Sequence, residues 1–427
     1  MTYLFETEKS LRRNGFYTYS QTCIQARRRV PMPEYAKHFR RYEMITIRPG
    51  SHVHTLLTIL SFVGEYPVTA LGLLGSVRSY KDLIHKLTMP QEFRIQGKEE
   101  RFTCRLLTVS GKGKRKTIRL HKSALPMLQY WDEDAYDNYM YEFDEHTFSG
   151  NARHVERNHL VAETAVMCMK AGIEANPLYT PEVIDDAVRR LRLTEPCFYF
   201  ARELKRVNDY ELNKIRFTRL AGAIVYPGGA YAVYNYREEM LKWMGEGEIK
   251  IKHHLHTIFT PMMSYEFPLR EAAVIFGADY DVALNMLKKM KETQKMDNGL
   301  FHTYKDIFFI PMDDFGARLL WVLTTWNWQE RILNALFDPK VRSYNRGSFT
   351  YDAHENGEFQ FSFLDGNIWR LFRFREAILN REGKFKIICY PEQLPFLRKY
   401  MGNLVKFSTV TMENAERVLE IKRKSLL

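Results

Sequence analysis

Residues 76–87 read SVRSYKDLIHKL and residues 111–116 read GKGKRK, and these two stretches decide the fold expected for the first third of the chain. In the first stretch, four apolar side chains recur at the spacing of one helix face: Tyr80, Leu83, Ile84 and Leu87. Ser76 or Ser79 can cap this helix, and Pro90 lies just beyond its end. The pattern predicts a short amphipathic helix whose other face is polar.

Two earlier helices and a later hairpin complete the expected unit. Helices are predicted at residues 54–63, 68–74 and 76–87, and strands at residues 101–110 and 117–121. Gly64 suits the end of the first helix, and Pro67 suits the start of the second. The basic stretch 111–116 joins the two strands. Three short helices followed by a hairpin predict a winged helix-turn-helix domain over residues 51–130.

The polar side chains of this unit are the predicted DNA contacts. In a helix-turn-helix, the exposed face of the second motif helix enters the major groove, and backbone contacts come from nearby cations. The predicted contacts are Arg78, Ser79, Lys81, His85, Lys86, Lys112, Lys114, Arg115, Lys116 and Arg119. A helical bundle with a charged face and a solvated turn are the alternatives. The basic hairpin directly after the helix favours DNA binding.

Charge is distributed unevenly along the chain. Residues 1–130 contain 23 Lys and Arg against 9 Asp and Glu, whereas the other 297 residues contain 40 against 42. The whole excess behind the net charge of +12 therefore lies in the first third. A basic segment joined to a neutral body is typical of a polyanion-binding module attached to another domain. A basic leader that only aids solubility is the alternative.

Composition excludes several classes of protein. The chain is 45% apolar and 27% charged, which is the balance of a folded protein rather than a disordered or fibrous one. No apolar run approaches the ~20 residues that cross a bilayer, and residues 1–13 are too polar for a secretory signal. We therefore expect a cytoplasmic protein without membrane insertion. Five scattered cysteines, without a C-x-x-C pair, predict neither a disulfide framework nor a cysteine zinc site, and we expect no cofactor.

The remaining chain divides into an acidic segment and two mixed regions. Residues 1–50 are expected to be a basic arm, and residues 131–150 a linker or a solvated helix. For residues 151–340, we predict helices at 151–171, 237–243, 269–276, 280–290 and 314–336, and strands at 197–204, 221–226, 230–236 and 303–311. For residues 341–427, we predict strands at 359–363, 384–390 and 404–410, and helices at 392–401 and 412–424.

One set of residues suggests metal-dependent nuclease chemistry: Glu163, Glu203 and Lys205. The triplet ELK at 203–205 resembles half of a nuclease signature. A second carboxylate on a neighbouring strand would be needed to hold Mg²⁺, and the following strands offer none. His159 shares a helix face with Glu163, but a third ligand at suitable spacing is missing. We therefore expect no metal site and no catalytic residue.

These stretches resemble the plasmid replication-relaxation family found on mobile elements of Gram-positive bacteria. The resemblance rests on the helix-turn-helix at 68–87, on TIRLHKSAL at 117–125 and on RNHLVAE at 157–163, and it covers about residues 50–260. It implies a winged helix followed by a restriction-endonuclease-like domain. Members often place an Asp in the strand matched here by Gly222, and an acidic strand end matched here by Tyr234 and Tyr236. These departures imply that nuclease chemistry is lost.

The sequence therefore predicts a mixed, α+β chain: a winged helix, then a mixed α/β domain that is nuclease-like without an intact site, then a C-terminal α/β segment. The expected function is that of a DNA-binding accessory protein of a plasmid or integrative conjugative element, in replication or relaxosome assembly, without catalysis of its own. The expected partners are double-stranded DNA, relaxase or replication proteins, and a second copy in a homodimer. A divergent Mg²⁺-dependent nuclease and a scaffold that binds RNA or an acidic protein are the alternatives.

Overall fold

The structure is a computed structural model that describes residues 44–175, 195–205, 218–238, 245–260, 271–293, 303–344 and 349–422. The expected basic arm and the helix expected over residues 237–243 lie largely outside these residues. The described chain is mixed α/β and contains four sheets. None of its helices has the length and apolar character needed to cross a membrane.

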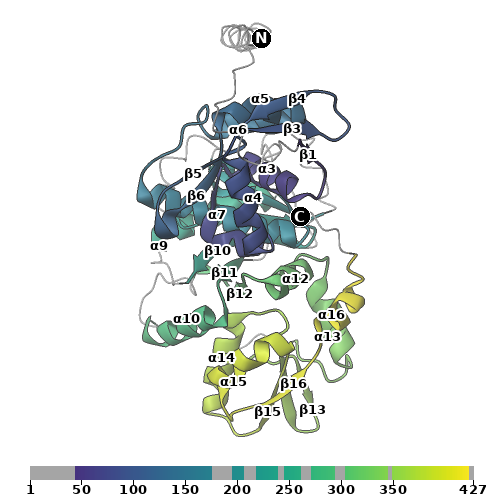
Figure 1. The fold of residues 1–427 in the computed structure, drawn as a ribbon. Helices are drawn as coiled ribbons and strands as arrows, with labels where there is room; N and C mark the ends of the chain where they lie inside the picture. The colour runs from purple at the N-terminus through teal and green to yellow at the C-terminus, as the bar shows by residue number, and fades with distance from the viewer. Residues whose placement is uncertain are drawn as a thin grey trace, which may run out of the picture. The chain divides into compact units, whose positions relative to one another are not determined.

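The first three described helices form where the sequence predicts them: α3 (His52–Val63), the 3-10 helix η2 (Val68–Leu73) and α4 (Val77–Leu87) (Figure 1). Ser51 and Ser76 cap α3 and α4, and each hydroxyl accepts a hydrogen bond from the backbone N–H three residues later, at 3.3 and 3.4 Å. Gly64 ends α3 with a φ of 71°. A Cβ at this position would lie 2.5 Å from the ring of Phe143, so both conformation and packing require glycine.

Two small sheets surround these helices. The first contains β1 (Ile45–Ile47), β3 (Gln91–Ile95) and β4 (Arg101–Cys104) in the order β1-β3-β4. The second contains β2 (Glu65–Pro67), β5 (Leu107–Ser110) and β6 (Thr117–Leu120) in the order β2-β6-β5, with a 3-10 turn, η3 (Gly113–Arg115), at the tip of the hairpin. The single strand predicted over 101–110 is wrong. It divides between the two sheets because Leu106 is buried and its N–H donates to the carbonyl of Leu87 at 3.1 Å.

The acidic segment is helical and packed. A 3-10 turn, η4 (Lys122–Ala124), leads into α5 (Leu125–Trp131) and α6 (Glu133–Glu142). Asp132 caps α6 by accepting the N–H of Ala135 at 2.9 Å. Tyr139 is fully buried in the core that also contains Leu56 and Leu60 of α3. Of the two readings offered by the sequence, a linker does not describe this stretch, because α6 supplies part of the core.

A six-stranded sheet forms the centre of the next region, in the order β12-β11-β10-β9-β8-β7. Its strands are β7 (Glu174–Ala175), β8 (Cys197–Phe200), β9 (Gly222–Tyr226), β10 (Gly229–Arg237), β11 (Ala272–Gly277) and β12 (Asp306–Pro311). β8, β9 and β10 pair antiparallel, whereas β11 and β12 continue the sheet in parallel to β10. The helix predicted over 269–276 is therefore wrong, because a short apolar run fits a fully buried strand as well as a helix.

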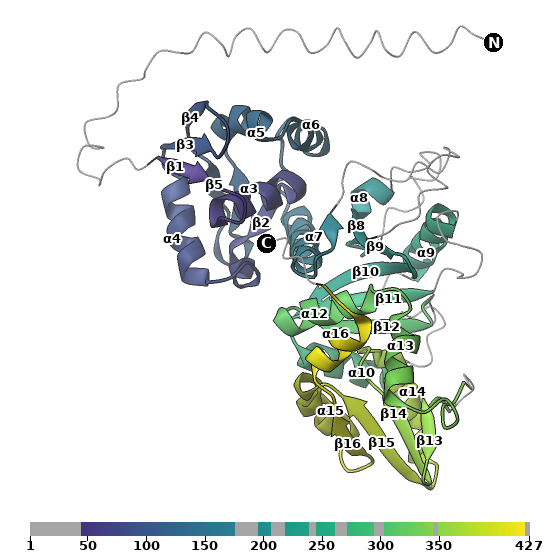
Figure 2. The same cartoon turned by 90° about the vertical axis from the view of Figure 1, so that its right-hand side faces the viewer.

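Helices cover both faces of this sheet. One core contains α7 (Ala152–Lys170), α12 (Asp314–Leu323) and α13 (Trp328–Leu336), and α7 lies against β10 (Figure 2). The other core contains α9 (Gly245–Phe259) and α10 (Tyr280–Thr293). The single helix predicted over 314–336 is interrupted at residues 324–327, between α12 and α13. Asn327, with a φ of 49°, precedes α13, and its left-handed conformation keeps the two helices from forming one.

The C-terminal segment is a second α/β layer, as the sequence predicts, although the strand at 353–355 and the helix at 368–379 were not predicted. Its strands are β13 (Ala353–Glu355), β14 (Glu358–Ser362), β15 (Lys384–Cys389) and β16 (Lys406–Thr409), which pair in chain order. Helices α14 (Ile368–Leu379) and α15 (Leu394–Met401), the latter preceded by the 3-10 turn η8 (Pro391–Gln393), pack on one face of this sheet (Figure 1). The last helix, α16 (Met412–Leu419), packs on α12 and α13, where Arg318 pairs with Glu413 and Glu416.

Candidate functional site

The polar face predicted for the third helix is exposed on α4. Tyr80, Ile84 and Leu87 are buried, so α4 turns its apolar side toward the core. The opposite side carries the predicted contacts, all exposed: Arg78, Ser79, Lys81, His85 and Lys86. Two basic side chains, His85 and Lys86, lie in the last turn, where a cation is favoured by the helix dipole. The helix thus offers a short polar surface on a rigid, capped element.

The basic hairpin tip is also exposed. All four cations of the stretch 111–116 are exposed to solvent: Lys112, Lys114, Arg115 and Lys116. Gly111 has a φ of 77°, and a Cβ there would lie 2.3 Å from the carbonyl oxygen of Arg115, so the turn needs glycine. Lys114 pairs with Glu238 at 3.2 Å, with both side chains largely exposed. An ion pair exposed to this degree contributes at most ~1 kcal/mol, so a phosphate can compete for Lys114.

Arg119 has a different role from the one predicted for it. Its guanidinium pairs with Glu65, a carboxylate that is 1% exposed, and stacks over the ring of Phe148 at 4.6 Å from the centroid. The side chain is 20% exposed. Because leaving Glu65 buried without its cation would be costly, Arg119 stabilises the fold here rather than standing free for a phosphate. Strand register explains the difference: Arg119 of β6 lies directly across from Glu65 of β2, so the two side chains share one face of the sheet.

A second polar cluster lies between α7 and the end of β10. Arg237 donates two hydrogen bonds to the Glu163 carboxylate, one of them from Nε at 3.0 Å, and Asn235 donates to the same carboxylate at 3.4 Å. Asn235 also donates to the carbonyl of Leu160 at 3.0 Å. Burial raises the pKa of the Glu163 carboxyl, and the hydrogen bonds from Arg237 oppose this. Glu163 is thus held in a neutralised, buried ion pair.

The other two members of the nuclease candidate set have other partners. The strand predicted over 197–204 ends at Phe200, and α8 (Ala201–Leu204) follows, so Glu203 and Lys205 do not stand at a strand end. Glu203 accepts the N–H of Phe200 at 3.1 Å, as a helix-capping residue does. Burial, followed by the charge of Arg157, lowers the pKa of Lys205 to about 8. Among the described residues, no three His, Cys, Asp or Glu side chains gather in an arrangement that could hold a metal ion.

A buried carboxylate on α9 was missed by the sequence analysis. Glu248 is fully buried and accepts hydrogen bonds from the Thr218 hydroxyl at 2.8 Å, the Arg219 N–H at 2.6 Å and the Tyr234 hydroxyl at 3.1 Å. Burial raises the pKa of its carboxyl, and these hydrogen bonds lower it. Helical spacing could have revealed it, because Glu248 shares the buried face of α9 with Ile251.

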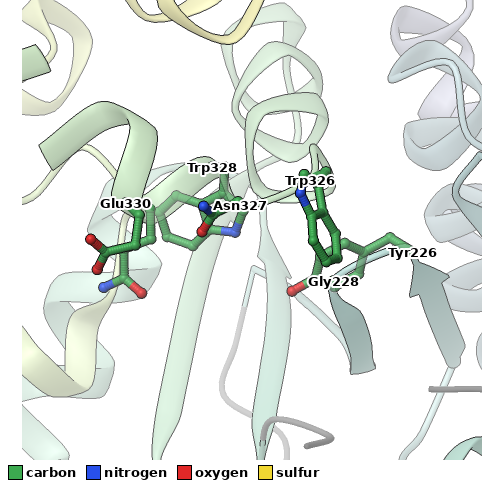
Figure 3. Close-up of a pocket in the computed structure, with 7 residues that line it drawn as sticks. Tyr226, Gly228, Trp326, Asn327, Trp328 and Glu330 are labelled. Carbon is green, nitrogen blue, oxygen red and sulfur yellow. The ribbon is translucent and has the colours of Figure 1, made fainter. Parts of the chain in front are cut away.

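A small aromatic cavity of about 80 Å³ lies where the loop between α12 and α13 meets the β9–β10 turn. The Trp326 ring lies beside Tyr226 and Gly228, with Asn327 and Glu330 on the other side (Figure 3). Trp326 is 43% exposed. This volume can accommodate only a few waters or a small group, which makes the cavity a packing feature rather than a ligand site.

Comparison of the chain with protein-family models, curated proteins and solved structures gives no match. Function must therefore be inferred from the residues themselves.

Proposed function

We propose that the protein is a DNA-binding accessory factor that contacts duplex DNA through α4 and the β5–β6 hairpin. The observation that carries this proposal is the pairing of two exposed basic elements in one folded unit. α4 presents Arg78 and Lys81 on the side opposite its buried apolar stripe, and the hairpin presents four cations in six residues. Arginine and lysine on such a helix can contact guanine edges or phosphates, and cations on a hairpin tip neutralise phosphates.

The order of elements supports a winged helix. The elements follow the order expected for three helices and a wing: α3, β2, η2, α4, β5 and β6. In the sheet order β2-β6-β5, the hairpin pairs with β2, the strand that joins α3 to η2. The backbone contact between Val68 and Lys116, 2.9 Å, joins the start of η2 to the hairpin tip. One departure is the hairpin β3–β4, which is inserted before the wing and pairs with β1.

The six-stranded sheet supports a restriction-endonuclease-like core in which no metal-binding group of side chains gathers among the described residues. A helix, three antiparallel strands, a second helix and a parallel strand follow in order as α7, β8–β10, α9 and β11. On β10, the side chains that face Glu163 are Asn235 and Arg237, whereas Tyr234 and Tyr236 enter the opposite core. An amide and a guanidinium therefore stand where a carboxylate and a lysine would be needed to hold and assist Mg²⁺.

The proposed setting follows from the family resemblance alone. A chain with a DNA-binding unit and a nuclease-like core without metal ligands would act in plasmid or conjugative-element replication, or in relaxosome assembly, by recruiting partners to a DNA site. Relaxase or replication proteins are the partners proposed, and a second copy of the chain would match a two-fold DNA site.

The test is competition binding on a duplex selected by the protein from a random library. Arg78→Ala and Lys81→Ala should each weaken the selected duplex by ~1–3 kcal/mol and reduce its preference over a scrambled duplex. Lys406→Ala, which removes an exposed cation from β16, is the matched control and should change neither quantity. Full retention of affinity and preference in both α4 variants would show that α4 does not enter the groove.

A further inference from the structure

A cavity of about 320 Å³ lies between α7 and the segment that leads into β9, apart from α4 and the hairpin. Arg153 and Arg157 line it from α7, Arg219 lines it from the opposite side, and Asn235 lines it from β10. Arg153 and Arg219 are exposed, so the cavity opens to solvent, whereas Arg157 is half-buried. A volume of this size is at the lower end of the range of small-molecule sites.

The cavity carries excess positive charge. Its lining contains three arginines and one carboxylate, Glu156. Lys205 and Glu248 both act electrostatically with Arg157. Asn235 contacts the Glu163–Arg237 ion pair, which adds one charge of each sign. Together these eight groups carry five positive and three negative charges. No ion pair within the described chain involves Arg153, Arg157 or Arg219, so these guanidiniums keep their donors for a ligand.

The fold holds these cations together at a cost. Arg153 and Arg157 stand four residues apart on α7, an arrangement of like charges that destabilises a helix by a few tenths of a kcal/mol. Burial, followed by the charge of Arg219, lowers the pKa of the Arg157 guanidinium. Glu248 fixes the backbone across the cavity by accepting the hydroxyl of Thr218 and the N–H of Arg219. An anion in the cavity would remove the repulsion, and the fixed backbone prepares Arg219 for it.

We propose that this cavity binds the phosphate group of a single nucleotide unit. Guanidinium groups match phosphate oxygens through paired, charge-assisted hydrogen bonds, and three of them around one opening can surround such a group. The volume admits one nucleotide unit and not a longer polymer. That the phosphate belongs to a nucleotide rests on the proposed DNA-binding function. That the ligand is a phosphate rests on the three arginines alone. A phosphate bound here would lie beside Asn235, and no group of three His, Cys, Asp or Glu side chains among the described residues is placed to hold a metal ion that could activate a water against it.

Isothermal titration calorimetry of the full chain tests the proposal with three probes: dTMP, a short single-stranded oligonucleotide with a 5′-phosphate, and the same oligonucleotide with a 5′-hydroxyl. Binding of dTMP and of the phosphorylated oligonucleotide, the latter tighter than binding of the 5′-hydroxyl oligonucleotide, supports a site open to free nucleotides and strand ends alike. Equal binding of the two oligonucleotides overturns the proposal. Binding of the phosphorylated oligonucleotide alone assigns the site to strand ends. Failure of both to bind overturns the proposal.

Matched variants locate the binding. Arg157→Gln and Arg219→Gln should each weaken the bound probe at least tenfold, whereas Arg417→Gln, an exposed arginine on α16, should leave it within twofold. Arg219 is exposed, so its variant should fold even if Arg157→Gln does not. Equal binding by Arg219→Gln and the unmodified chain overturns the proposal. The α4 variants test duplex binding separately, because Arg78 and Lys81 do not line the cavity. The proposed DNA-binding function and the proposed phosphate site can therefore be refuted independently.

Discussion

His159 on α7 should make the protein less stable in mild acid. Its side chain is 1% exposed, and its Nε2 lies 2.7 Å from the hydroxyl of Thr117, the first residue of β6. Burial, assisted by the charges of Arg237 and Arg119, lowers the pKa of the imidazole to about 4. In the unfolded chain, the pKa returns to about 6.5. The unfolded chain therefore gains a proton first as the pH falls, and stability present above about pH 6.5 is lost toward pH 4.

The size of the effect follows from the two pKa values. Between pH 7 and pH 5, the difference in proton binding lowers the free energy of unfolding by about 2 kcal/mol. Urea denaturation at both pH values should show this loss of unfolding free energy in the unmodified chain. In His159→Gln, which can still hydrogen-bond to Thr117, the loss between the two pH values should be smaller by about 2 kcal/mol. His253→Gln, at an exposed position on α9, is the control and should behave as the unmodified chain does. An equal loss in His159→Gln and the unmodified chain would show that His159 is not the titrating group.

Three further predictions concern the wing, the C-terminal core and catalysis. Replacing the three cations at 114–116 with Gln should weaken binding to all duplexes alike. Measured by fluorescence anisotropy, the slope of log K against log salt concentration should fall by up to ~0.9 per lost phosphate contact. An unchanged slope would place the hairpin away from DNA. Arg370→Met should lower the free energy of unfolding, measured by urea denaturation, by ~3–5 kcal/mol. The reason is that Asp352 and Asp365 then stay buried beside each other without their cation. A loss under ~1 kcal/mol would contradict this. Supercoiled plasmid should stay intact with excess protein and Mg²⁺ or Mn²⁺, and nicking that disappears in Glu203→Gln would support the nuclease alternative.

Local patterns in the sequence were sufficient for α3, η2, α4 and β6. The helical spacing that ends at Leu87 and the capping serine at 76 define α4 almost to the residue, because both signals arise within a few positions. The alternation in residues 117–121 likewise locates β6. These elements are predictable because each is encoded by its own side chains.

Tertiary contacts determined what the sequence could not show. The run AAVIFG at 272–277 becomes a central strand because β10 and β12 supply hydrogen-bonding partners on both sides. Arg119 was assigned to DNA because its buried partner, Glu65, lies more than fifty residues earlier. The arginines around the α7 cavity come from two elements, and only folding brings them to one opening. In each case the deciding neighbour is distant in sequence.

Contacts from α7 and from Arg202 make the unit that holds α3, α4 and the β5–β6 hairpin part of a larger body. Asn158 of α7 donates to Glu65 at 2.9 Å, and His159 bonds to Thr117, so two buried polar groups of the unit find partners on α7. Arg202, just after β8, donates to the carbonyl of Phe62 at 2.6 Å. Buried polar groups deprived of such partners cost ~1–3 kcal/mol each. The helix α4, which we propose contacts DNA, and the arginine-lined cavity therefore belong to one interdependent structure. The buried face of α7 supports the β5–β6 hairpin, and its N-terminal turns present Arg153 and Arg157 to the cavity.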